Sequence, residues 1–233
     1  YDTDRNNFDF VIQDNPNPQN SLMLSEPRNN LPNLMVDSSW PTWQGNLRRT
    51  GLVNVSSLAT STFYVKWSLP MDVLSQPVLD KENNIYILSS EGVNKISPEG
   101  YLLWTNSDVS ILGLVPSPLI LENGTLFLRS AWGLFAINSE GNFLWKFPLS
   151  GGTGVSSALA ILSDGAIITQ SSEKIYAINQ DATLKWIFDP ARPIKNCNSV
   201  GGFVIDSLDN IFFTVDDYLY KISSDGVLLW EKN

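Results

Sequence analysis

Five tryptophans recur at nearly even distances along this chain, and their spacing constrains the fold more than any other feature. Trp67, Trp104, Trp145, Trp186 and Trp230 are separated by 37, 41, 41 and 44 residues. Each of the last four follows an isoleucine by 8 residues and an aromatic residue or isoleucine by 18 residues. These partners are Ile96 and Tyr86, Ile137 and Phe127, Ile178 and Ile168, and Ile222 and Phe212. Two fixed intervals held four times predict a tandem array of one structural unit of roughly forty residues.

Each unit is predicted to contain four short β-strands. Segments rich in β-branched and aromatic residues alternate with turns that carry Asn, Asp and Gly, residues that tolerate the left-handed backbone of tight hairpins. Four antiparallel strands repeated radially predict an all-β fold, a β-propeller of four-stranded antiparallel blades. The predicted blades cover residues 76–106, 115–147, 157–188 and 201–232. One turn, Gln180-Asp181-Ala182, has alanine where its three counterparts have glycine, so we expect it to be the most strained or to be of a different type.

The two ends of the array predict an incomplete ring. Val65–Ser68 reads as one strand of a further blade whose other three strands are absent. We expect the chain to be a fragment of a longer protein, or two chains to pair into an eight-bladed ring, because open arrays expose edge strands that invite association. Residues 1–39, crowded with Asn, Asp and Pro, are predicted to be an extended tether, and residues 40–233 to be the propeller.

Composition excludes several classes of function. The net charge is −9, the pI is about 4.4 and no Lys/Arg cluster occurs, so nucleic acids and anionic membranes are not expected partners. The chain has no histidine and a single cysteine, Cys197, which excludes intrachain disulfides, Cys/His zinc sites and His-based catalytic triads. No apolar run reaches the ~20 residues that a membrane helix needs.

Two stretches of the repeat resemble the PQQ-like, or quinoprotein alcohol dehydrogenase-like, propeller superfamily. They run from Leu134 through Gly141 to Trp145 and from Ile175 to Trp186, and the segment from Trp40 to Gly51 resembles the lead-in of the same superfamily. The resemblance implies that the repeat tryptophans stack against neighbouring blades. It also implies an extracytoplasmic location, whether secreted, cell-surface or periplasmic.

Within that superfamily, the resemblance points to the non-catalytic branch that includes assembly lipoproteins of the BamB type. The catalytic quinoproteins hold PQQ and calcium with the help of a vicinal cysteine pair, which a chain with Cys197 alone cannot form. We therefore expect no cofactor, and we assign no catalytic and no metal-binding residue. The acidic turns, such as Asp80–Asn83, Asp206–Asn210 and Asp216-Asp217, are interpreted as hairpin turns, with calcium loops as the alternative.

The candidate contact surface is the face that carries the loops of variable length. Strands alternate in direction, so the loops after the tryptophan strands share one face with the short turns between second and third strands. The longest such loop, Asp189–Gly201, contains Arg192, Lys195 and Asn196, which we select as candidate partner contacts. Trp132, outside the aligned set, is interpreted as a core residue, with a stacking platform for a sugar or peptide as the alternative. Asn54 and Asn123 begin glycosylation sequons.

These observations favour a non-enzymatic propeller that presents its loop-rich face to a protein or glycan partner. One alternative is a propeller enzyme, a hydrolase or lyase acting on an extracellular polymer, with its site in missing blades or on the same face. The other alternative is a structural spacer in a surface protein.

Overall fold

The computed structural model describes residues 65–109, 117–149, 159–171, 174–190 and 202–233. All of them belong to the compact unit Pro32–Asn233. The predicted tether lies outside the described residues, as do Arg192, Lys195, Asn196 and Cys197. In the described part of the chain, no helix is long and apolar enough to cross a membrane.

The described residues form sixteen strands in four sheets, which we call sheets 1 to 4 in chain order. Sheet 1 contains β1 (Val78–Leu79), β2 (Ile85–Ser89), β3 (Gly92–Ile96) and β4 (Leu102–Asn106). Sheet 2 contains β5 (Leu119–Ile120), β6 (Leu126–Ser130), β7 (Gly133–Ile137) and β8 (Phe143–Pro148). Sheet 3 contains β9 (Ala160–Ile161), β10 (Ile167–Gln170), β11 (Ile175–Ile178) and β12 (Leu184–Phe188). Sheet 4 contains β13 (Val204–Ile205), β14 (Ile211–Val215), β15 (Tyr218–Ile222) and β16 (Leu228–Lys232).

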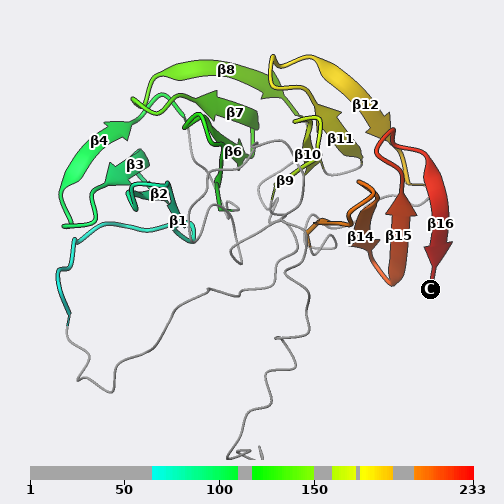
Figure 1. Cartoon of the computed structure of the whole chain (residues 1–233), viewed down its shortest axis with the longest axis horizontal. Coiled ribbons are helices and arrows are strands. Elements are labelled where there is room, and N and C mark those ends of the chain that lie inside the picture. Colours follow the sequence, from blue (N-terminus) through cyan, green and yellow to red (C-terminus); the bar gives the residue numbers. More distant parts are fainter. Residues whose placement is uncertain (1–64, 110–116, 150–158, 172–173, 191–201) are drawn as a thin grey trace, which may run out of the picture. The chain divides into compact units, whose positions relative to one another are not determined.

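Every sheet is antiparallel, and its strands pair in the order in which they follow in the chain (Figure 1). The prediction of four-stranded antiparallel units is confirmed. The first strand of each sheet is short, at two residues. In sheet 1 the reason is visible: Leu88 N–H donates to Ser75 Oγ (3.0 Å) instead of to a strand, and Pro77 has no N–H to offer.

The segment predicted as a lone strand, Val65–Ser68, is not a strand. Residues 65–72 have no regular secondary structure, since the described residues offer them no strand to pair with. Trp67 nevertheless contacts sheet 1 in the manner of the other repeat tryptophans, as shown below.

The turn that joins the third and fourth strands, which we call the outer turn, is the same in all four sheets. In each, the N–H of the fourth turn residue donates to the carbonyl of the first, and the register of the preceding strand shifts at one bulge. The fourth residues are Gly100 (φ 92°), Gly141 (φ 85°), Ala182 (φ 67°) and Gly226 (φ 77°). The predicted strain at Ala182 is confirmed: its turn has the common hydrogen bonding, but an L-residue is held in left-handed backbone.

Burial shows which sheets have a neighbour on both faces. All described residues of β6 in sheet 2 and β10 in sheet 3 are buried. In β2 of sheet 1, the alternate residues Ile85 and Ile87 are partly exposed, and in β14 of sheet 4 the opposite alternation exposes Phe212 and Thr214. Because successive strand residues point to opposite faces, sheets 2 and 3 are covered on both faces and sheets 1 and 4 on one face only.

The tryptophans join each sheet to the next. The indole Nε1–H of Trp67, Trp104, Trp145 and Trp186 donates to the carbonyl of the second outer-turn residue of the following sheet. These acceptors are Pro98 (3.0 Å), Ser139 (3.2 Å), Gln180 (2.8 Å) and Ser224 (2.8 Å). The outer-turn glycines lie so close to the indoles that a Cβ on Gly100, Gly141 or Gly226 would be 2.6, 2.8 or 2.7 Å from a ring carbon. Each contact therefore combines partial burial of an aromatic ring with a satisfied N–H.

Candidate functional site

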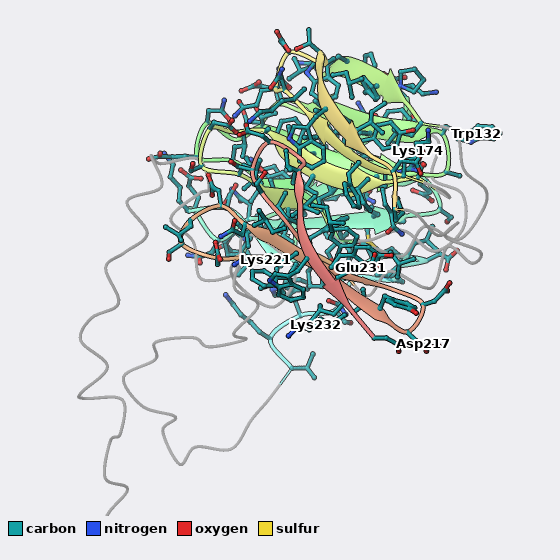
Figure 2. All side chains as sticks on the ribbon, turned by 90° about the vertical axis from the view of Figure 1, so that its right-hand side faces the viewer. Trp132, Lys174, Asp217, Lys221, Glu231 and Lys232 are labelled. Atoms are coloured by element: carbon teal, nitrogen blue, oxygen red, sulfur yellow. The ribbon has the colours of Figure 1, made fainter. Side chains whose placement is uncertain are left out.

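One end of the sheets carries the turns between second and third strands, and we call it the loop-rich face. Trp132 lies on the β6–β7 turn, Lys174 at the end of the β10–β11 turn and Asp217 on the β14–β15 turn. Figure 2 shows these three labelled side chains on the same side of the molecule. The loops that follow the fourth strands begin at this same end, because strand direction alternates within each sheet. The face thus gathers the segments in which the four repeats differ most.

Trp132 projects from this face. Its side chain is 54% exposed, so the interpretation of Trp132 as a core residue is wrong. The physical reason is that the turn is tight. The backbone N–H of Trp132 donates to Ser130 Oγ (3.3 Å), and Gly133 lies so close to β8 that a Cβ on it would be 2.3 Å from the carbonyl oxygen of Phe147. The backbone packs against β8, and the indole is left to point outward.

A buried arginine fixes the turn that carries Trp132. Arg129 is fully buried, and its Nη1 donates to the carbonyl of Gly133 (3.3 Å). Its Nε and Nη2 donate to the carbonyl of Gln170 in sheet 3 (3.3 and 3.2 Å). A planar guanidinium can bridge two sheets in this way because its donors point in fixed directions. Sequence reasoning missed Arg129, although it is a charged residue inside the apolar run from Leu126 to Ile137.

The other sequence-selected contact residues are not brought together with Trp132 by any described contact. Arg192, Lys195 and Asn196 lie outside the described residues, and their loop is described only at its start. There, Lys174 Nζ lies 3.0 Å from Asp189 Oδ2, which ties the β10–β11 turn to the beginning of the loop. Both side chains are partly exposed, so this ion pair contributes little to stability.

The acidic residues of the first hairpin turns have internal partners. Asp80 accepts hydrogen bonds from the backbone N–H and side-chain amide of Asn84 (both 2.8 Å) and from Tyr86 OH (3.1 Å). Lys95 Nζ lies 3.5 Å from the same carboxylate. Burial and then the Asp80 charge raise the pKa of the Tyr86 hydroxyl well above its usual range.

Sheet 4 repeats this arrangement. Asp206 accepts from the backbone N–H and side-chain amide of Asn210 (2.8 Å each), and Lys221 Nζ lies 3.6 Å away. Partial burial acts to raise the pKa of Asp206, but the hydrogen bonds from Asn210 and Leu208 and the charge of Lys221 outweigh it and lower the pKa. These carboxylates therefore serve the turns, as interpreted from the sequence. The described residues hold no group of three or more Cys, Asp or Glu side chains placed to bind a metal ion.

Solved structures with the same architecture are β-propellers. Streptogramin B lyase superposes with a TM-score of 0.57 at 13% identity, covering 71% of this chain and 56% of that chain. BamB from Moraxella catarrhalis gives 0.56 at 16%, covering 71% of this chain and 50% of that chain. The extracellular domain of a candidate hybrid two-component system from B. thetaiotaomicron gives 0.56 at 16%, covering 71% and 23%.

These similarities confirm the predicted fold class, and at such identities they show the fold alone. The chain spans about half the length of the first two proteins. No family model matches the chain, and no curated protein sequence is significantly similar to it.

Proposed function

We propose that this chain is a non-enzymatic binding module that uses its loop-rich face to hold a protein or glycan partner outside the cytoplasm. We also propose that its repeats belong to the PQQ-like superfamily, in the non-catalytic branch of the BamB type. The resemblance of the Trp145 and Trp186 repeats supports the assignment to that superfamily. An extracellular domain among the similar structures is consistent with the location.

The observation that carries the proposal is the exposed indole of Trp132 on a turn that is held by hydrogen bonds to the Arg129 and Ser130 side chains. An indole offers a large apolar face for stacking on a sugar ring or a peptide and an N–H donor at its edge. The Arg129 and Ser130 hydrogen bonds hold the turn, so little conformational freedom of the backbone is lost when a partner binds. Exposed tryptophans placed in this way are frequent hot spots of binding.

The test is a glycan array together with pull-down of identified proteins, followed by affinity measurements on Trp132→Ala. We expect the dissociation constant to rise by roughly 30-fold or more, the effect of losing a hot-spot side chain. Tyr101→Ala is the matched control, because Tyr101 is also aromatic and 71% exposed but lies beside the outer turn at the opposite end of sheet 1.

Both variants should unfold within about 0.5 kcal/mol of the parent protein, since neither side chain is buried. Equal affinities of the Trp132→Ala and Tyr101→Ala variants would contradict the assignment of the loop-rich face. Turnover of a bound polymer would contradict the non-enzymatic part of the proposal.

A further inference from the structure

The outward face of sheet 4 has the chemistry of a face that elsewhere in this chain is covered by another sheet. Phe212 is partly exposed there, and Val204 and Leu219 are 43% and 40% exposed. Their counterparts in sheet 2 include Phe127 and Leu134, which are buried. The apolar column that closes the interface between sheets 2 and 3 is thus repeated on sheet 4, with no described residue covering it.

Trp230 stands in the place of the four tryptophans that bridge sheets. It packs edge-on against Phe212, with ring centroids 6.1 Å apart and planes at 65°, much as Trp104 packs against Tyr86 at 5.9 Å and 67°. Within the described residues, however, its indole N–H meets no acceptor, whereas the other four each donate to an outer turn. The ring is positioned for a contact that the described residues do not complete.

The charged residues on the outward face of sheet 4 indicate which kind of surface could pack against it. Sheet 4 has a cluster of Asp206, Asn210 and Lys221, which matches the Asp80, Asn84 and Lys95 cluster at the same repeat positions in sheet 1. Sheets 2 and 3 lack this cluster, because they have leucine in place of the aspartate and alanine in place of the lysine. The ion pair in sheet 1 is covered by sheet 2, with its lysine and aspartate 15% and 6% exposed, against 22% and 31% for the pair in sheet 4. Sheet 4 therefore presents the surface that sheet 1 presents to sheet 2.

The outer turn of sheet 2 complements that surface by charge. Its residue before the glycine is Glu140, whose negative charge adds to burial and to Asp80 in raising the pKa of Tyr86. An acidic residue precedes the glycine or alanine in all four outer turns: Glu99, Glu140, Asp181 and Asp225. On sheet 4, Lys221 Nζ lies 5.0 Å from the centroid of the Phe212 ring and Lys232 Nζ lies 5.7 Å from the centroid of the Trp230 ring. Both lysines, labelled in Figure 2, would face such a residue.

We propose that this face of sheet 4 docks a further blade of the same repeat, one that resembles sheet 2 and whose outer turn ends in an acidic residue and glycine. Trp230 donates its N–H to the turn carbonyl, and Lys221 faces the acid. A second copy of the four sheets does not fit, because each of its outer turns already holds Trp67, Trp104, Trp145 or Trp186. This surface is separate from the loop-rich face, so the inference does not depend on the proposed function.

The experiment appends a copy of residues 108–149 directly after Asn233. The natural spacing is preserved, because Asn233 follows Trp230 by three residues as Ser107 follows Trp104. We expect hydrogen exchange of the Trp230 indole N–H, assigned with Trp230→Phe, to slow by about tenfold or more as the contact becomes part of the cooperative fold. In a matched control the appended copy carries Gly141→Val, which places a side chain against the indole and should abolish the protection.

A charge exchange provides a second measurement that leaves the turn glycine intact. Lys221→Glu should reduce the protection of Trp230 in the extended protein, and Glu140→Lys in the appended copy should restore it. An appended blade that leaves Trp230 exchanging as fast as in the 233-residue protein would overturn the proposal, whether or not that blade folds. So would a dimer of the 233-residue protein in light scattering that dissociates on Trp230→Ala, because a second copy would then occupy this face.

Discussion

Replacing Ala182 by glycine should stabilise the protein, although it removes a methyl group. Ala182 has φ 67° at a position where the other three outer turns have glycine. Left-handed backbone destabilises the folded state of an L-residue by about 1–2 kcal/mol, and glycine removes this strain. Glycine also gives the unfolded chain more conformational freedom, which lowers the free energy of unfolding by about 0.4–1 kcal/mol. We expect a net stabilisation of about 0.5–1 kcal/mol, or a rise in Tm of roughly 1–4 °C for a domain of this size.

The same substitution should also reorient Trp145. The Trp145 ring lies at 40° to Phe127, whereas the corresponding pairs in sheets 1 and 4 lie at 67° and 65°. Because the turn glycines almost touch the indoles, we attribute the difference to the Ala182 methyl group. Ala182→Gly should therefore change the near-UV circular dichroism of the folded protein as well as its stability.

The reverse substitution is the matched control. Gly141→Ala introduces left-handed strain and places a Cβ 2.8 Å from Trp104 Cδ2. Overpacking typically adds about 1–3 kcal/mol, so we expect a net destabilisation of about 2 kcal/mol or more in urea unfolding. If Ala182→Gly destabilised the protein while Gly141→Ala had no effect, the account of the outer turns would be wrong.

Three further predictions concern the same contacts. Trp104→Phe removes the donor to a turn carbonyl and should cost about 2 kcal/mol, whereas Trp230→Phe should cost clearly less; urea unfolding of the pair would refute this if the order were reversed. Arg129→Met keeps an apolar stem but removes the guanidinium hydrogen bonds to the carbonyls of Gly133 and Gln170, so we expect a loss of about 2–4 kcal/mol, and a near-neutral result would exclude a bridging role. The pKa of Asp206 is lowered from 3.8, so its stabilising contribution is present above that pH and is lost as the pH falls through the folded-state pKa. Asp206→Asn should therefore flatten the decline of unfolding free energy below about pH 4, and an unchanged decline would contradict the assignment.

The repeat pattern was sufficient to predict the sheets, because tryptophans and turn residues recur at positions that the blade geometry fixes. The strain at Ala182 followed from a single departure from that pattern. The early end of ladder pairing in the first strand of sheet 1 could not be predicted, since Ser75 Oγ replaces a ladder partner there in a way that composition does not indicate.

The candidate site was harder to predict than the fold. The sequence favours core packing for Trp132, because a tryptophan beside an apolar strand is usually buried, and only the closeness of Gly133 to β8 shows why the ring points outward. The role of Arg129 depends on a carbonyl 41 residues away in the chain, a separation that no local motif encodes. The contacts of Arg192, Lys195 and Asn196 remain predictions.

Indole hydrogen exchange, measured by NMR on protein labelled with ¹⁵N-tryptophan, tests most directly whether each tryptophan bridges to the following sheet. We expect the indole N–H groups of Trp67, Trp104, Trp145 and Trp186 to exchange slowly, because each donates to an outer-turn carbonyl, and the indole N–H of the exposed Trp132 to exchange fast. Equal exchange rates for Trp104, Trp186 and Trp132 would contradict it.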